Sequence, residues 1–274
     1  MPRVVSEEKK AGVVKTYKEK PITISALAKQ FNLSSPTIMK ILNDNGIKRY
    51  TKTQLYNPNM NEDYFETIDN QTNAYFLGLI IADGNVFKDD YSNRQTSISI
   101  TLEDSDIYML QKFKDEIRVE TSINSDGRGS SMIAVRSNKM ANDLSKYGVV
   151  PRKSLITYLP EIEPSLMRHL IRGILDGDGN VQGKQTNINN RYKHSVGFCG
   201  SNLLMTQIRD WLVENVGVSK NKIYEYSNRC LSMVTWTSIT DMQLLYHYFY
   251  DDSDIYLTRK KDIFDKVMNH YSLK

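Results

Sequence analysis

The sequence predicts an α+β protein that contains two similar subdomains with the element order αββαββα, preceded by a small all-α domain. A segment near residue 80 is repeated near residue 175, each copy is followed by the same succession of strands and helices, and the first fifth of the chain is basic with a helical pattern. These observations give the expected boundaries: an N-terminal domain over 1–50, a linker over 51–72, and subdomains over 73–164 and 165–274.

Length and composition fit an ordinary folded protein. The chain has 274 residues, of which 40% are hydrophobic and 25% charged. No apolar run approaches the roughly 18 residues of a membrane span, and the start "MPRVVSEEKK" lacks the apolar segment of a signal peptide. We therefore expect an intracellular protein. Cys199 and Cys230 have neither metal-ligand spacing nor a disulfide framework.

Positive charge is concentrated at the N-terminus. Residues 1–52 hold 11 Lys/Arg and 4 Asp/Glu, a net charge of +7, whereas the rest of the chain carries −3. A basic segment on a nearly neutral body is typical of a nucleic-acid-binding module. The alternative is a basic extension that only keeps the protein soluble.

The N-terminal segment "TISALAKQFNLSSPTIMKILNDNGI" predicts two short helices joined by a tight turn. Ser25 is the expected N-cap of the first helix and Ser35 that of the second, with Pro36 in the first turn, and Asn45-Gly46 ends the second helix. Together with a helix over 7–18, this arrangement resembles a helix-turn-helix module.

In such modules the second helix enters the major groove of DNA. This resemblance places Ser35, Thr37 and Lys40 toward the bases, and Lys48 and Arg49 near phosphates. The alternative is a small helical bundle that makes protein contacts. Residues 51–70 are polar and without a sustained period, which favours a linker with one helical turn at most.

The larger part of the chain is duplicated. "AYFLGLIIADGNV" at 74–86 aligns without gaps to "HLIRGILDGDGNV" at 169–181, and the apolar positions match in kind. Strand "TSISITL" and helix "SDIYMLQKFKDEI" follow the first copy, "HSVGFC" and "NLLMTQIRDWLVENV" the second. A candidate hairpin, a further helix and an Arg-Lys pair complete each half. The identical pairs are Gly78/Gly173, Asp83/Asp178, Gly84/Gly179, Asn85/Asn180 and Val86/Val181.

Small residues in each copy predict close packing of the two helices. Gly78 and Ala82 are four residues apart, as are Gly173 and Gly177, so each pair lies on one helix face and leaves a groove without large side chains. If the two helices pack through these grooves, Asp83 and Asp178 meet at their C-terminal ends. Two adjacent carboxylates repel unless a cation lies between them, and a divalent metal such as Mg²⁺ prefers oxygen ligands.

These two segments resemble the paired motifs of the LAGLIDADG homing endonucleases, here "FLGLIIADG" at 76–84 and "IRGILDGDG" at 171–179. The resemblance covers about residues 73–270. It implies a pseudo-symmetric monomer, since family members with two motifs are single chains, and a site-specific endonuclease that makes a staggered cut in double-stranded DNA. It also implies Mg²⁺ or Mn²⁺ as cofactor, with about two to three ions shared between Asp83 and Asp178.

The family's site residues transfer by motif position. The eighth position, the catalytic and metal-binding aspartate, is Asp83 and Asp178, and the preceding carbonyl that contacts metal belongs to Ala82 and Gly177. Asp176 occupies the sixth position, but Ile81 replaces it in the first copy, so the resemblance gives Asp176 no catalytic role.

A basic residue is expected near the end of each half. Lys153 in "VPRKS" and Lys260 in "LTRKK" fit this position, with Lys261 as a substitute in the second half. The polar residue that the family often places near the attacking water has no clear counterpart: the candidate positions hold Ser99 or Thr101, and Gly197 or Cys199.

The resemblance implies two four-stranded antiparallel sheets that form a DNA-binding saddle, whose concave face lies in the major groove and reads base edges. The segment "QGKQTNINNRYKH" at 182–194 is rich in side chains suited to base edges, and a shorter polar set precedes the strand of the first half. The expected DNA-binding residues of the two sheets are Arg94, Gln95, Ser97, Ser99, Lys184, Gln185, Asn187, Asn189, Arg191 and Lys193.

The alternative function is a nucleic-acid binder that does not cleave, either a group I intron maturase or a transcription regulator. Aspartates in both motifs favour the enzyme, since a binder needs no pair of metal-holding carboxylates. The four histidines have neither zinc-site nor histidine-nuclease spacing.

Overall fold

The computed structural model describes residues 5–88, 95–153, 156–186, 192–226 and 231–272. The chain forms two compact units. The first comprises Met1–Asn61 with Arg118–Glu120, and the second comprises Glu62–Ile117 with Thr121–Lys274.

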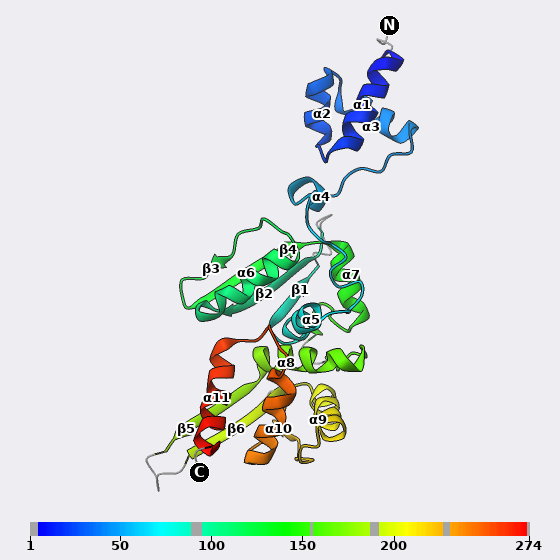
Figure 1. Cartoon of the computed structure of the whole chain (residues 1–274). Coiled ribbons are helices and arrows are strands. Elements are labelled where there is room, and N and C mark those ends of the chain that lie inside the picture. Colours follow the sequence, from blue (N-terminus) through cyan, green and yellow to red (C-terminus); the bar gives the residue numbers. More distant parts are fainter. Residues whose placement is uncertain (1–4, 89–94, 154–155, 187–191, 227–230, 273–274) are drawn as a thin grey trace. The chain divides into compact units, whose positions relative to one another are not determined.

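The first unit is a cluster of helices around its own apolar core (Figure 1). Its helices are α1 (Glu7–Glu19), α2 (Ile24–Phe31), α3 (Ser35–Asp44) and the short α4 (Lys52–Tyr56). The core residues come from α1, α2 and α3, and they are Val13, Tyr17, Leu27, Ala28, Ile38, Ile41 and Leu42. A three-residue turn joins α2 to α3, and Asn32 takes the left-handed conformation there at φ 49°.

The helix caps differ from those expected. The side chain of Thr23 accepts a hydrogen bond from the Ala26 backbone N–H at the start of α2, so Thr23 is the N-cap and not Ser25. At the start of α3, Ser34 accepts from the Thr37 N–H, so the cap is one residue earlier than Ser35. Both helices therefore begin earlier than the sequence suggested, because the adjacent hydroxyl residues compete for the same role.

The second unit contains two halves whose elements follow the same order, except that the second half ends in one further helix (Figure 1). The first half runs α5 (Gln71–Asp83), β1 (Gly84–Phe87), β2 (Ser97–Glu103), α6 (Ile107–Glu116), β3 (Asn124–Ser125), β4 (Ser130–Arg136) and α7 (Asn138–Lys146). The second runs α8 (Met167–Asp178), β5 (Asn180–Gln185), β6 (Tyr192–Gly200), α9 (Asn202–Val216), β7 (Tyr224–Tyr226), β8 (Leu231–Trp236), α10 (Ile239–Tyr250) and α11 (Thr258–Ser272).

Each half has one four-stranded antiparallel sheet, in the orders β1-β2-β4-β3 and β5-β6-β8-β7. Burial alternates along the strands, as in β2, where Ile98, Ile100 and Leu102 are buried and the residues between them are partly or fully exposed. Among the described elements, helices therefore pack on the buried face of each sheet, and the partly or fully exposed residues lie on the other face, called the open face below. These findings confirm the expected α+β fold with two similar subdomains.

The two halves meet through α5 and α8, whose backbones are in contact. A Cβ atom added at Gly78 would lie 2.0 Å from the Leu170 carbonyl oxygen, and one at Gly173 would lie 2.1 Å from the Tyr75 carbonyl oxygen. Glycine is required at both positions because any side chain would overlap the backbone of the other helix. This contact places the C-terminal ends of α5 and α8 next to each other.

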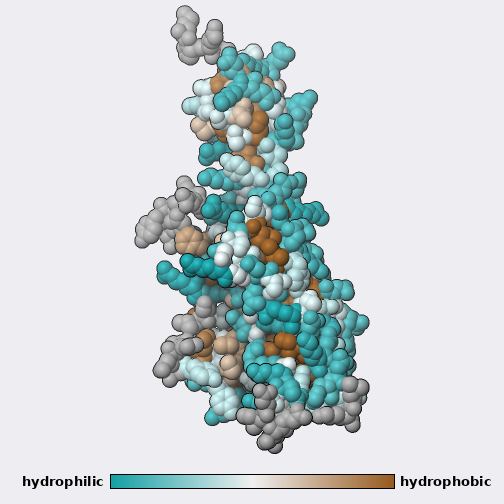
Figure 2. Space-filling view, turned by 90° about the vertical axis from the view of Figure 1, so that its left-hand side faces the viewer, coloured by the Kyte–Doolittle hydropathy of each residue, from teal (hydrophilic) through white to brown (hydrophobic). Residues whose placement is uncertain are grey.

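None of the helices that the structure describes is long and apolar enough to cross a membrane. Figure 2 shows a mostly hydrophilic face on which the hydrophobic residues form separate small patches.

Candidate functional site

Asp83 and Asp178 are the last residues of α5 and α8, so the helix contact brings their carboxylates together. A Cβ atom added at Gly177 would lie 3.2 Å from Asp83 Oδ2 and 2.3 Å from the Ala82 Cβ. Asp83 is therefore packed against the residue that precedes Asp178. The sequence prediction that these two carboxylates lie near each other agrees with this geometry.

The protein around the two carboxylates disfavours their charged forms. Burial, followed by the negative charge of Asp178, raises the pKa of Asp83 from 3.8 to about 6. Loss of surrounding water also raises the pKa of Asp178, although Lys153 and Lys260 act in the opposite direction. A bound cation would offset the repulsion between the carboxylates, so the pair has the electrostatics of a cation site.

Lys153 and Lys260 lie at the same ends of these helices. The Lys153 ammonium donates to the Ile81 carbonyl oxygen at 2.8 Å, and that of Lys260 donates to the carbonyl oxygens of Leu175, Asp176 and Gly179 at 2.7, 2.6 and 2.7 Å. Positive charge is favourable there because the last carbonyls of a helix have no partner within the helix. Burial lowers the pKa of both lysines, that of Lys260 to about 8.

Lys261 lies in a different environment from Lys260. Its ammonium pairs with Asp265 at 2.9 Å and lies 5.6 to 5.7 Å from the ring centroids of Tyr246, Tyr250 and Tyr256. Of the two lysines that the sequence offered for the second half, Lys260 contacts the motif helix, and Lys261 contacts α10 and α11 residues.

Asp176 is fully buried and has structural partners. Its Oδ2 atom accepts from the Tyr75 hydroxyl at 2.8 Å and from the Leu257 N–H at 2.7 Å, whereas Oδ1 has no partner. Burial raises the pKa of Asp176 to about 6. Its carboxylate links α5, α8 and the segment before α11, in line with the expectation that it has no catalytic role.

The oxygen atoms at this place fit a divalent metal. They comprise the carboxylates of Asp83 and Asp178 and the carbonyls of Ala82 and Gly177, which lie 3.4 and 3.3 Å from the ammonium groups of Lys153 and Lys260. Oxygen ligands of this kind are typical of Mg²⁺ and Ca²⁺ sites. Among the described residues, no group of three or more His, Cys, Asp or Glu side chains could hold a metal.

Several expected DNA-binding residues lie on the open faces of the sheets. Ser97 and Ser99 alternate with the buried residues of β2, and Lys184 pairs with Lys193 across β5 and β6 on the corresponding face. Gln185 pairs with Tyr192 and has the opposite orientation by the same alternation. Gln95 is half-buried just before β2. Arg94, Asn187, Asn189 and Arg191 lie outside the described residues.

The strand registers place further polar residues on the open faces, which the sequence pattern alone did not indicate. Asn85 pairs with Ser99, Arg136 with Ser97, and Gln182 with Ser195, so these side chains share the open faces. Exposed aromatic rings occur there as well, at Phe87 on β1 and at Tyr224 and Tyr226 on β7. Strand alternation contains this information, but only the register shows which strands are neighbours.

In the first unit, the predicted DNA-binding side chains lie on α3. Lys40 is exposed, while Ser35 and Thr37 are half-buried. The Thr37 hydroxyl forms a 2.8 Å hydrogen bond with that of Ser34.

The chain has two packed helices that end in adjacent carboxylates, each followed by a four-stranded antiparallel sheet, and this fold is similar to that of solved LAGLIDADG endonuclease structures. Two solved structures with this fold are similar to the chain. One is the I-SmaMI LAGLIDADG homing endonuclease bound to cleaved DNA, with 14% identity, a TM-score of 0.51, and coverage of 76% of this chain and 91% of that one. The other is the LAGLIDADG meganuclease I-AabMI bound to uncleaved DNA, with 12% identity, a TM-score of 0.53, and coverage of 75% and 91%.

A third similar structure is I-SmaMI bound to an uncleaved DNA target in the presence of calcium ions. It is 15% identical, with a TM-score of 0.51, and the match covers 75% of this chain and 93% of that one. No family model and no curated protein matches the sequence. At this level of identity the likeness shows the fold, and it confirms the structural part of the resemblance found in the two motifs.

Proposed function

We propose that the chain is a site-specific endonuclease that cuts both strands of double-stranded DNA with a stagger. The observation that carries this proposal is the pair Asp83 and Asp178, held together at the ends of two helices whose glycines allow backbone contact. Burial of a repelling carboxylate pair is costly, so a fold that maintains it has a use for the charge. The three similar solved structures, each bound to cleaved or uncleaved DNA, support the same conclusion.

The metal in this proposal is Mg²⁺ or Mn²⁺, held by Asp83 and Asp178 with the carbonyls of Ala82 and Gly177. When bound, it would supply an activated water and stabilise the leaving oxygen of a phosphodiester. The calcium in one I-SmaMI structure supports a divalent ion.

The residues of the chain contribute charge and position. Lys153 and Lys260 hold positive charge at the helix ends, where it stabilises the negative charge that develops on a phosphate during hydrolysis. Their ammonium groups also donate hydrogen bonds to main-chain carbonyl oxygens in the C-terminal turns of α5 and α8. These hydrogen bonds hold the turns in place and thereby position the two carboxylates. No covalent intermediate is required, because water is the nucleophile.

DNA recognition is assigned to the open sheet faces and to α3. Ser97 and Ser99 on the first sheet, with Lys184 and Lys193 on the second, offer polar and basic groups to base edges and phosphates. Ser35, Thr37 and Lys40 on α3 would add contacts outside this region in the manner of a helix-turn-helix module. The protein acts as a monomer in this proposal because one chain supplies both motifs.

The test uses the full chain, Mg²⁺, and a duplex that joins the two flanks of the gene without the gene itself. Double-strand breaks with a uniform stagger are expected, and sequencing of the ends maps them. Cleavage that persists in Asp83→Asn and Asp178→Asn would refute the metal assignment. Tight binding of DNA or of the intron RNA without any cut would instead support the non-cleaving maturase or regulator.

A further inference from the structure

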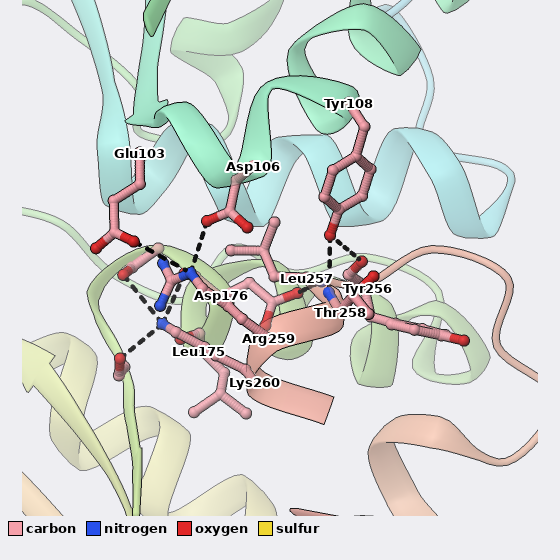
Figure 3. A network of polar contacts seen from close by, with 12 residues as sticks. Glu103, Asp106, Tyr108, Leu175, Asp176, Tyr256, Leu257, Thr258, Arg259 and Lys260 are labelled. Carbon is pink, nitrogen blue, oxygen red and sulfur yellow. Dashed lines mark hydrogen bonds and ion pairs between the residues drawn. The ribbon is translucent and has the colours of Figure 1, made fainter. Parts of the chain in front are cut away.

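An ion pair connects the two halves beside Lys260. Arg259 comes directly before Lys260, and its Nε atom lies 2.7 Å from Oδ2 of Asp106, which belongs to the first half (Figure 3). Asp106 is the residue before α6 and is 1% exposed. Glu103 of the same half lies farther from the guanidinium, at 3.6 Å, and is exposed. The pair with Asp106 is therefore the shorter and better shielded of the two.

The two residues before Arg259, Leu257 and Thr258, also form hydrogen bonds with other elements. Thr258 N–H donates to the Tyr108 hydroxyl at 2.7 Å, and Leu257 N–H donates to Asp176 Oδ2 at 2.7 Å. Figure 3 shows these contacts together with the Lys260 side chain, which extends to the Leu175 carbonyl at the end of α8. Each of the three residues that lead into Lys260 thus has a partner in another element. Two of the three partners, Tyr108 and Asp106, belong to the first half.

The first half has a different arrangement around its own lysine. Arg152 precedes Lys153 as Arg259 precedes Lys260, but Arg152 is exposed and adopts φ 61°. The position that corresponds to Asp106 before the next helix is occupied by Ser201, the N-cap of α9. Its hydroxyl donates to the Thr157 carbonyl at 2.6 Å, a contact between neutral groups. Among the residues that the structure describes, the charged contact therefore occurs beside Lys260 and not beside Lys153.

We propose that Asp106 is a positioning residue for the lysine of the opposite half, because its carboxylate fixes Arg259 and so the first turn of α11, from which Lys260 extends to the end of α8. Asp106 contacts neither Asp83 nor Asp178 through any hydrogen bond or ion pair that the structure describes, so its effect passes through Arg259. The inference rests on the proposed endonuclease function. It adds that cleavage of the two DNA strands depends on different residues. Loss of Asp106 slows the cut that uses Lys260 and leaves the cut that uses Lys153 nearly unchanged.

The experiment measures the cleavage rate of each strand in a duplex labelled on one strand at a time. Lys260→Ala and Lys153→Ala first identify the strand that depends on each lysine. Asp106→Asn should then slow the Lys260 strand by about tenfold or more, since small displacements of a site residue have effects of this size. The other strand should change by less than about twofold, and nicked DNA should accumulate. Asp106→Glu retains the carboxylate and should bring the ratio of the two strand-cleavage rates back close to the wild-type value.

Glu103→Gln is the matched control, because it removes a neighbouring carboxylate that is exposed and farther from Arg259. It should leave both strand rates unchanged. Hydrogen exchange gives a second measurement that needs no DNA: amides of 257–261 should exchange faster in Asp106→Asn, and those of 147–153 should not.

Three results would overturn the inference alone while the wild type cuts DNA: an equal loss on both strands, no loss on either, or unchanged exchange at 257–261. A wild-type protein that cuts neither strand refutes the proposed function and this inference together.

Discussion

Gly78 and Gly173 face each other across the two motif helices: a Cβ atom added at Gly173 would lie 3.1 Å from the Gly78 Cα. A Cβ atom at Gly78 or Gly173 would also overlap a backbone carbonyl oxygen of the opposite helix, at distances of 2.0 and 2.1 Å respectively. The helices can approach this closely only because neither residue has a side chain. The position of the two carboxylates at the helix ends depends on this approach.

Substitution of either glycine should therefore destabilise the second unit. Gly78→Ala and Gly173→Ala are each expected to lower the free energy of unfolding by about 3 kcal/mol, since a methyl group has no room and the backbones must separate. Thermal and denaturant unfolding would measure this loss. Gly12→Ala in α1 is the control, because the added Cβ would meet only the ring of Phe31 and alanine favours helices. Equal stability of the Gly78→Ala and wild-type proteins would contradict the packing described here.

Asp83→Asn should separate stability from activity. Burial and the charge of Asp178 raise the pKa of Asp83 to about 6, so its carboxylate is costly to the metal-free fold at neutral pH. We expect the variant to gain about 1 kcal/mol of stability without metal and to lose cleavage by about 10³-fold or more. Unfolding in a chelator and cleavage in Mg²⁺ provide the two measurements. A variant that is less stable than the wild type and also fails to cleave DNA would indicate a structural role for the carboxylate.

The two adjacent lysines of α11 should respond differently to substitution. Lys260→Ala should abolish the cut of one strand, because it removes the ammonium at the end of α8. Lys261→Ala should leave cleavage intact and lower stability by about 1 kcal/mol, because it removes the ion pair with Asp265 and the contacts with three tyrosine rings. If Lys261→Ala abolished the cut and Lys260→Ala did not, Lys261 would be the lysine that stabilises the phosphate charge.

His169 should make the stability of the fold depend on pH. Burial, with the positive charges of Arg172 and Arg168, lowers the pKa of His169 from 6.5 to about 4. Its Nδ1 atom also forms a 2.8 Å hydrogen bond with the Arg172 guanidinium. The unfolded chain therefore binds more protons than the folded one between pH 6.5 and 4. Stability should fall by up to about 3 kcal/mol as the pH decreases across this range.

The contribution of His169 is isolated by comparing the pH dependence of unfolding in the wild type and in His169→Gln. The variant should lose most of this slope, whereas His247→Gln, which changes an exposed histidine, should keep it. An unchanged slope in His169→Gln would assign the pH dependence to other groups.

Substitutions on α3 should weaken DNA binding without slowing the cut itself. Lys40→Ala is expected to reduce the slope of log affinity against log salt by about one, and Thr37→Ala to lower affinity for the preferred sequence. Binding titrations at several salt concentrations, with single-turnover cleavage at saturation, measure both effects. Lys15→Ala on α1 removes an exposed lysine from another helix and serves as the control. A fall in the saturated rate, with unchanged affinity, would contradict a binding role for α3.

The repeat and the strand alternation predicted the two halves, because the two copies align without gaps and strand alternation is a local pattern with a fixed period. The helix caps were less well determined: Ser34 and Ser35 are adjacent hydroxyl residues, and only the backbone geometry selects the first. The pair Arg259 and Asp106 could not be predicted, since 153 positions separate the two residues and no periodicity relates them. Asp176 stood out as an acid without a counterpart, but its bonds to Tyr75 and Leu257 required the fold.

The contact between α5 and α8 also limits how the two copies can diverge after duplication. Of 13 aligned positions in the repeat, 5 remain identical, and they include the facing glycines. A change at either glycine alters the backbone of both halves, so neither helix can drift alone. The side chains of the open sheet faces lie outside this helix contact, and corresponding positions there already differ: Ser99 pairs with Asn85 in the first half, and Gly197 pairs with Asn180 in the second. Under the proposed function, changes on the strands could therefore alter the DNA target while the helices remain fixed.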